Sequence, residues 1–400
     1  MTGDRLKVLH ITDTLGMGGA ETWMMALLRL WSKEGGPCCD FLMTSGNRGI
    51  FDSEAESLGA RLHYLPFTRR TLPGFVLGFR GLLRRERYDV IHDHQAYISG
   101  WHFLIAGGLL PRVAVAHVHN PSYQITEDYG VSWPRQAAGK LGRTLVSRLA
   151  TAVVGTSQEA LNEHGFARAD FPSLARAPLY CGFSPEIFLG DRAAACASLR
   201  GEFGWPQDAR IILFAGRMDR SPDVGHKQNH KNSGFAVDVV IAAIARDPKV
   251  RVLFAGITTA ALPVLEERLA AAGVRDHVVF AGIRNDMPRL MLAADALLFP
   301  SRAEGLGMVA VEAQSSGLPV LASTAVPREC VVLPGLVRFL PVENNVPLWV
   351  DNLLALMALP RDMESANQAV KASPFAIRNS ARSLEILYRT GLPPGNIGNA

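Results

Sequence analysis

Residues 296–323 read ALLFPSRAEGLGMVAVEAQSSGLPVLAS and decide the fold class. The apolar run at residues 296–300 predicts a buried strand, and a glycine-rich loop follows it. An apolar segment that begins near Gly307 predicts a helix, and residues 319–322 predict the next strand. Because strands joined through a helix pair in parallel, this stretch predicts a layered α/β fold.

The same alternation of strand and helix runs along the rest of the chain. In the first half it predicts strands at residues 6–12, 39–43, 61–64, 90–92, 113–117 and 151–155, and a helix at 20–31. In the second half it predicts further strands at residues 210–215, 250–255 and 277–281, and helices at 235–245 and 262–271. The pattern indicates two Rossmann-like, doubly wound parallel sheets.

A region rich in Pro, Gly and Ala at residues 178–206 separates the two series of strands. We therefore expect an N-terminal domain of residues 1–184 and a C-terminal domain of residues 185–375. A helical stretch at residues 376–390 could pack on either half. Two such domains predict a cleft between them that binds a small molecule.

Composition excludes several classes of protein. The chain has 400 residues, 48% hydrophobic and 20% charged, which excludes a disordered chain. A net charge of +4 is too small to indicate a nucleic-acid partner. Five cysteines without metal or disulfide spacing indicate reduced thiols. With no signal segment and no apolar run of about 18 residues, we expect a cytoplasmic protein.

A glycine motif, GMGGAE at residues 16–21, follows the first predicted strand and begins a helix. Gly18 and Gly19 let the backbone approach an anion at the positive end of the helix dipole. The alternatives are an ordinary turn between strand and helix, or a dinucleotide fingerprint. The glycine spacing does not match G-x-G-x-x-G.

A second motif places cations after the strand at residues 210–215. Arg217 ends that strand, and a polar loop with Lys227 and Lys231 follows. An arginine and a lysine at the carboxyl end of a strand suit a pyrophosphate and the charge of a leaving diphosphate. The alternative is a solvated loop with routine charges.

The third motif is PSRAEGLGMVAVEA at residues 300–313. Glu304 lies in the loop, and Glu312 lies about two turns into an apolar helix, where a carboxylate is costly without a partner. Both suit hydroxyl groups of a sugar or ribose. The backbone N–H groups of Gly307, Met308 and Val309 suit a phosphate. The alternative is that Glu312 pairs with an internal arginine.

Histidines follow two predicted strands, as His92 and His94 in VIHDH and as His117 and His119 in VAHVHN. Alternate residues of a strand share one face, so each pair can point into the cleft. We expect a polar role in the cleft for at least one of them, and no metal site.

Together these motifs resemble those of the retaining glycosyltransferases of family 4, a GT-B group that builds polysaccharides and glycolipids. The segments that carry the resemblance are GMGGAE, Gly216-Arg217 with Lys231-Asn232, and the segment 296–324 with PSRAEGLGMVAVEA and GLPVLAS. The resemblance implies transfer of a sugar from a nucleotide-diphosphate sugar to a hydroxyl acceptor, which is either a soluble sugar or a lipid-linked sugar.

The resemblance also implies roles for individual residues. Arg217 and Lys231 hold the diphosphate, Glu304 binds the transferred sugar, and Glu312 binds the ribose. The backbone at Ile283 and Arg284 contacts the base, Gly18 and Gly19 close on the diphosphate, and His119, or else His117, lies near the reacting sugar. The loop before Lys231 is longer than in the family and repeats HKQN as HKN at residues 226–232, so Lys227 and Lys231 stay alternatives.

The chain has no Asp-x-Asp motif, which fits a reaction that requires neither a metal nor another cofactor. Other enzymes of the GT-B group, an epimerase or a phosphorylase, are the nearest alternatives. A nucleotide-binding oxidoreductase or a non-catalytic protein fits the motifs less well. Acceptor loops such as residues 123–133 vary freely, so the acceptor cannot be read from them.

Residues 69–87 form a basic stretch with interleaved apolar side chains. It contains six arginines, which are Arg69, Arg70, Arg80, Arg84, Arg85 and Arg87. Such a stretch is typical of a helix that lies on an anionic bilayer, here the inner face of the cell membrane. A core helix with a solvated basic end explains the pattern equally well.

Overall fold

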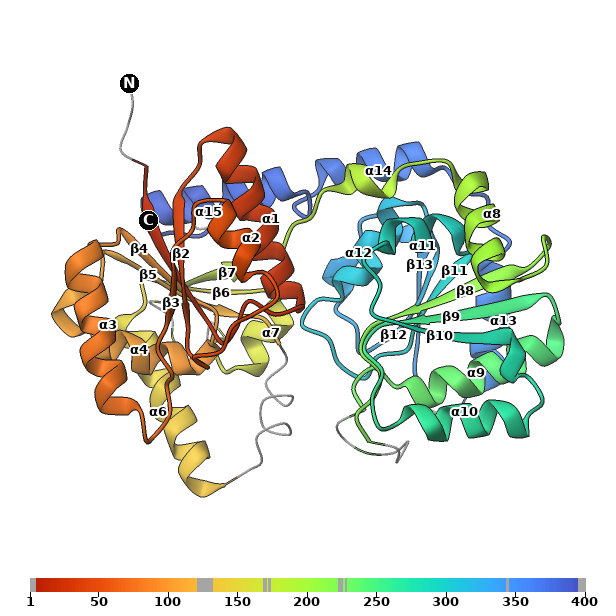
Figure 1. Ribbon diagram of the computed structural model, residues 1–400, viewed down its shortest axis with the longest axis horizontal. Coiled ribbons are helices and arrows are strands. Elements are labelled where there is room, and N and C mark those ends of the chain that lie inside the picture. Colours follow the sequence, from red (N-terminus) through yellow and green to blue (C-terminus); the bar gives the residue numbers. More distant parts are fainter. Residues whose placement is uncertain are drawn as a thin grey trace. The chain divides into compact units, whose positions relative to one another are not determined.

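The computed structural model describes residues 5–120, 132–167, 171, 174–221, 226, 229–342 and 345–394. The chain divides into two compact units. The first consists of Met1–Phe183 and Pro374–Ala400, and the second of Ser184–Ser373. Each unit contains its own parallel sheet with helices on both faces (Figure 1).

The sheet of the first unit has the strand order β3-β2-β1-β4-β5-β6-β7, and every pair is parallel. Its strands are β1 (Lys7–Thr12), β2 (Cys38–Met43), β3 (Leu62–Tyr64), β4 (Val90–Asp93), β5 (Val113–Val118), β6 (Ala152–Gly155) and β7 (Ala175–Pro178). The sheet order changes direction at β1 and β4, the point at which ligands bind in open α/β sheets.

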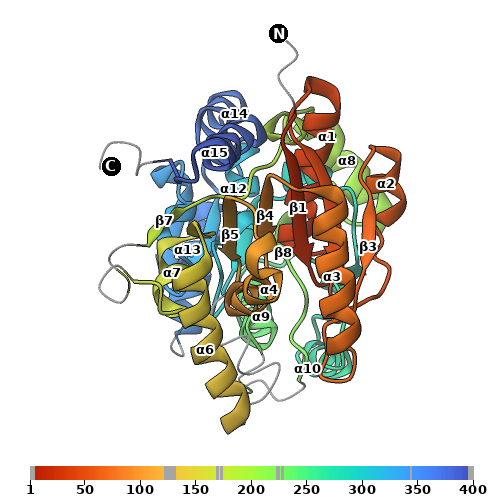
Figure 2. The same ribbon diagram turned by 90° about the vertical axis from the view of Figure 1, so that its left-hand side faces the viewer.

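Helices cover both faces of this sheet (Figures 1 and 2). They are α1 (Gly19–Glu34), α2 (Asp52–Ser57), α3 (Leu72–Glu86), α4 (Ser99–Ala106), α6 (Trp133–Leu149), α7 (Gln158–Glu163) and α15 (Ile377–Thr390). One apolar core joins Leu9 and Ile91 of the sheet to Phe75 and Phe79 of α3. The opposite face is covered by α1 and α15, which contact each other.

The sheet of the second unit has the strand order β10-β9-β8-β11-β12-β13. Its strands are β8 (Arg210–Ala215), β9 (Val250–Ala255), β10 (Val278–Gly282), β11 (Ala296–Phe299), β12 (Val320–Ser323) and β13 (Val337–Leu340). Its helices are α8 (Arg192–Phe203), α9 (Ser233–Arg246), α10 (Leu262–Ala271), α11 (Met287–Ala293), α12 (Met308–Ser315), α13 (Val346–Leu356) and α14 (Met363–Ala372). A core of side chains from α9, α10 and α13 packs on one face of this sheet.

Two strands were not predicted from the sequence, β7 and β13. Each is the last strand of its sheet, and its residues are only partly buried. Neither therefore shows the continuous apolar run by which the central strands were recognised. Each also carries an arginine, Arg176 or Arg338, within a four-residue strand.

Within the described part of the chain, none of the helices has the length and hydropathy that crossing a bilayer requires.

Candidate functional site

The predicted diphosphate-binding residues of the second unit lie at the carboxyl end of its sheet. Gly216 and Arg217 follow β8 directly, and the Arg217 side chain is exposed. Lys231 lies two residues before α9, and its Cε would be 3.4 Å from a Cβ added at Gly216. The fold thus brings Lys231 back to the end of β8, next to the backbone that carries Arg217.

Glu304 joins this group from the loop after β11. Its Oε1 forms an ion pair with Nζ of Lys231, and only 27% of the lysine side chain and 12% of the glutamate side chain are exposed. The same Nζ lies 5.5 Å from the centre of the Phe299 ring. Two of the predicted site residues are therefore in direct contact. Lys227, the alternative lysine, lies outside the described residues.

Asp219 holds the loop that carries Lys231. Its buried carboxylate accepts hydrogen bonds from the backbone N–H groups of Lys231 and Asn232, each at 3.1 Å, and from the Ser233 hydroxyl at 2.8 Å. In the sequence, Asp219 stands out only as the start of a polar loop. A carboxylate that caps a helix can be recognised from the sequence when it directly precedes the helix. Asp219 lies 14 residues before the first residue of α9, so the sequence does not reveal this role.

Two contacts join this loop to the loop that follows β11. The Asn232 side-chain amide donates to the Pro300 carbonyl at 3.2 Å, and the Arg302 N–H donates to the His230 carbonyl at 2.7 Å. The lysine loop and the Glu304 loop are thus one hydrogen-bonded structure.

The predicted phosphate-binding helix is α12. Gly307 is its N-cap with a φ of 90°, and a Cβ there would lie 3.0 Å from both Phe299 and Val326. Only glycine fits this turn. Among the residues that the structure describes, no side chain caps this helix, which leaves the first-turn N–H groups of Met308 and Val309 without a side-chain acceptor.

Glu312 is the fifth residue of α12, one turn into the helix, not two as the sequence analysis expected. Within the described residues its carboxyl has no hydrogen bond and no ion pair, so the alternative of an internal arginine partner does not apply. Burial raises the pKa of the Glu312 carboxyl to about 7.

Ile283 and Arg284 follow β10. The Ile283 side chain is 57% exposed, and Ile257, which follows the neighbouring strand β9, is 42% exposed. The Arg284 side chain forms ion pairs with Glu202 and Asp286, at 2.7 and 2.8 Å. Because these ion pairs engage the Arg284 side chain, the backbone of Arg284 is the part that can contact a base.

In the first unit, Gly18 is the N-cap of α1 and Gly19 is its first residue. The Glu21 carboxylate folds back toward this helix end, since a Cβ on Gly18 would meet its Oε2. Burial raises the pKa of Glu21, and hydrogen bonds from the backbone of Glu21 and Gly18 oppose that shift. The chain's own carboxylate thus lies where an anion was predicted, and the sequence analysis did not single it out.

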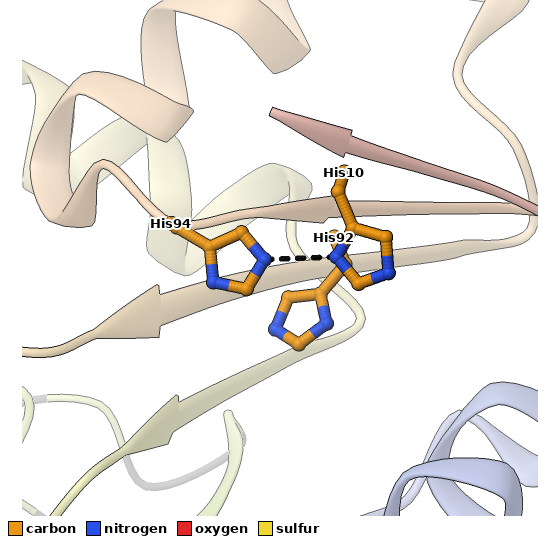
Figure 3. Close-up of side chains that lie close together, drawn as sticks. All are labelled: His10, His92 and His94. Carbon is orange, nitrogen blue, oxygen red and sulfur yellow. Dashed lines mark hydrogen bonds between the residues drawn. The ribbon is translucent and has the colours of Figure 1, made fainter. Parts of the chain in front are cut away.

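The histidines of the first unit form one cluster. His92, His94, His117 and His119 lie together, and His10 of β1, which was not among the predicted residues, joins them. His10 Nδ1 lies 2.9 Å from His94 Nε2, and His94 Nδ1 lies 2.9 Å from His119 Nε2 (Figure 3 shows the first of these contacts). These three rings form a hydrogen-bonded chain.

A second chain of hydrogen bonds runs beside the first. The Tyr388 hydroxyl of α15 contacts His92 Nδ1 at 2.7 Å, and His92 Nε2 contacts His117 Nδ1 at 3.1 Å. The two chains stack, with the ring centres of His92 and His94 4.2 Å apart. The Trp23 ring of α1 presents an edge to the cluster.

Burial keeps these imidazoles neutral. It lowers the pKa of His10 and of His119 to about 3 and holds the pKa of His92, His94 and His117 well below the usual range. In each of two groups of three histidines, one nitrogen per ring lies within 4.8 Å of the other two, a spacing that could hold one metal ion. These groups are His10, His92 and His94, and His94, His117 and His119.

Two family models match the chain. The model of the glycosyl transferase 4-like domain matches residues 18–171, and that of glycosyl transferases group 1 matches residues 209–358. The two matches fall in the first and the second compact unit respectively.

Among curated proteins, the putative glycosyltransferase EpsF of Bacillus subtilis is 27% identical over 363 residues, which are 90% of each chain. The D-inositol 3-phosphate glycosyltransferase of Mycobacterium tuberculosis is 30% identical over 340 residues. That match covers 78% of this chain and 65% of the relative, so the chain spans less than two thirds of the mycobacterial protein.

Among solved structures, a glycosyltransferase from Rickettsia africae superposes with a TM-score of 0.76 at 15% identity, over 97% of this chain and 98% of that one. HepE of Anabaena, solved in complex with UDP and glucose, superposes with a TM-score of 0.72 at 18% identity, over 95% and 98%. At these identities the likeness is one of fold.

Proposed function

Because the chain is a glycosyltransferase of the GT-B, family 4 type, we propose that it moves a sugar from a nucleotide-diphosphate sugar to a hydroxyl acceptor with retention of configuration. Solved relatives of the same fold bind UDP with glucose, or UDP-glucose. The retaining course rests on the resemblance of the motifs to family 4, in which the leaving phosphate guides attack on the same face of the sugar.

The observation that carries the proposal is the group formed by Lys231, Glu304 and the uncapped start of α12. It combines a cation for a phosphate, a carboxylate for sugar hydroxyls and a helix end for a second phosphate. When the diphosphate binds Lys231, it replaces Glu304 there and releases that carboxylate for the transferred sugar.

Arg217, Lys231 and the dipole of α12 then stabilise the negative charge of the leaving diphosphate. The backbone that carries Lys231 and the start of α12 is fixed before the reaction, since Asp219 and Gly307 hold the two loops. We propose that this arrangement does the work of a divalent cation at the phosphates. Lys231 is our choice over Lys227, because Lys231 contacts Glu304.

Glu312 suits the ribose, and the exposed Ile283 suits the base. The roles of Gly18, Gly19 and His119 in the first unit stay predictions. For the two glycines the structure adds a condition: a diphosphate at the start of α1 must displace the Glu21 carboxylate.

For the acceptor, we propose a sugar of polysaccharide or glycolipid synthesis and a membrane contact through residues 69–87. Four apolar residues of α3 face the core, and these are Phe75, Phe79, Leu82 and Leu83. Leu77 is 76% exposed, and Arg84 is exposed two turns further along the same side. Arg80 has a structural role, because its side chain donates hydrogen bonds to the carbonyls of Ile105 and Ala106. The surface proposed to contact the membrane therefore contains fewer residues of the stretch 69–87 than the sequence predicted.

A donor screen tests the transferase proposal. The protein is incubated with nucleotide-diphosphate sugars of different bases and sugars and with soluble or lipid-linked acceptors, and released nucleoside diphosphate is measured. We expect one donor to be cleaved in an acceptor-dependent way, and Glu304→Gln to remove most of this activity. The matched control is Glu364→Gln, an exposed glutamate of α14. Full activity of well-folded Glu304→Gln would remove Glu304 from the site.

A further inference from the structure

Three histidines of the first unit lie close together. His10 and His92 are paired neighbours on strands β1 and β4, and His94 follows two residues after His92 on the same face. One ring nitrogen of each histidine lies within 4.8 Å of one nitrogen of each of the other two. Figure 3 shows the rings of His10 and His94 pointing at each other, with His92 beside them.

Their chemistry is that of a transition-metal ligand set. Imidazole nitrogen suits Zn²⁺, Cu²⁺ and Ni²⁺, and three histidines with one open position are a known arrangement for zinc. A ligating imidazole must be neutral, with a lone pair on the nitrogen that faces the ion. Each ring offers one nitrogen to the ion and keeps its single proton on the other.

A metal ion can replace the hydrogen bond between His10 Nδ1 and His94 Nε2 without either ring losing its proton. The proton that the two nitrogens share moves to the far nitrogen of the ring that donated it, and both facing nitrogens then carry lone pairs. The ring stack and the strand register, which place these nitrogens, do not change with this exchange.

The outer nitrogens of two of these rings already have partners. If His94 binds the ion through Nε2, its Nδ1–H donates to His119 Nε2, at 2.9 Å. Both nitrogens of His92 have partners, Tyr388 at Nδ1 and His117 at Nε2, so binding the ion breaks one of these hydrogen bonds and keeps the other. Such partners fix the ring orientation of metal-binding histidines.

We propose that His10, His92 and His94 bind one divalent transition-metal ion of the zinc type, with water in the fourth position. His94 is the partly exposed member of the three and gives the ion a point of entry. The bound ion holds the His94 proton on Nδ1 and so makes His119 Nε2 an acceptor, which fixes the tautomer of His119. The site is in the first unit and leaves the phosphate-binding residues Arg217 and Lys231 unchanged.

Zinc binding to the whole protein tests this proposal. The protein is stripped with a chelator, dialysed against dilute Zn²⁺, and its zinc content and Tm are measured. We expect about one zinc per chain and a rise in Tm, because an ion that binds only the folded state stabilises it. His10→Phe should lose both effects, and its ring can keep the stack on Phe41. The matched control, His63→Gln on β3, should keep them.

Co²⁺ provides a measurement that needs no variant. If the site forms, one equivalent of Co²⁺ gives the intense visible absorption of a tetrahedral site, and Zn²⁺ abolishes it.

Three results would overturn the proposal. The first is a wild type that binds no zinc and shows no tetrahedral Co²⁺ absorption. The second is His10→Phe binding as much zinc as the control variant. The third is loss of the ion in His117→Phe while His10→Phe keeps it. The last result would assign the ion to the other group of histidines. None of these measurements uses sugar transfer, so their failure is separate from failure of the proposed function.

Discussion

Replacing Glu304 with glutamine should change nucleotide binding and catalysis in opposite directions. In the protein without donor, Glu304 holds Lys231 in an ion pair that a diphosphate has to displace. Both side chains are partly accessible, so the pair is worth about 1 kcal/mol or less. Without the charge of Glu304, the free nucleoside diphosphate should bind up to about fivefold more tightly.

Transfer should fall in the same variant. The lost hydrogen bond from a sugar hydroxyl to a charged carboxylate is worth about 1.5–3 kcal/mol, which is roughly a ten- to hundredfold drop in kcat/KM. Calorimetry with the nucleoside diphosphate of the preferred donor measures the first effect, and released diphosphate measures the second. Weaker nucleotide binding in Glu304→Gln, or unchanged transfer, would refute the reasoning. Glu364→Gln should change neither.

Three further predictions follow from the same structure. Arg217→Ala and Lys231→Ala should lower turnover more than they weaken binding of the nucleoside diphosphate, because charge on the leaving group grows in the transition state. Since these cations stabilise that charge, the wild-type rate should not depend on added Mg²⁺ or Mn²⁺. A strict requirement for either ion would contradict this account. Since burial raises the pKa of Glu312 to about 7 and a ribose hydroxyl favours the carboxylate, nucleotide affinity should rise more steeply through about pH 7 in the wild type than in Glu312→Gln. The wild type should sediment with anionic liposomes at low salt and release at high salt, and the double variant Leu77→Ser, Arg84→Ser should stay in the supernatant; a wild type that never sediments would indicate a soluble acceptor.

The central strands and the main site loops were predictable because their signals are local. Apolar runs mark β1, β4, β5 and β8, and GLGMVAVE marks the start of α12. The edge strands β7 and β13 lack that signal, because partial burial leaves their sequence mixed.

The missed site residues share a different cause, which is that their partners are distant in the chain. Asp219 acts on backbone 12 to 14 residues away, and His10 meets His94 across 84 residues. His10 could have been found, because LHI in β1 repeats the alternation of VIHDH and VAHVHN on neighbouring strands. The ion pair between Lys231 and Glu304 had no local signal, since it depends on how two loops fold against each other.

The most direct test of the account is the anomeric configuration of the product. The preferred donor, with its sugar in a known configuration, is allowed to react with its acceptor, and the anomeric coupling constant and carbon shift of the new linkage are read by NMR. A retaining transferase gives the same configuration in product and donor. An inverted linkage would contradict the proposed course of the reaction, and release of nucleoside diphosphate without any new glycosidic bond would contradict sugar transfer itself.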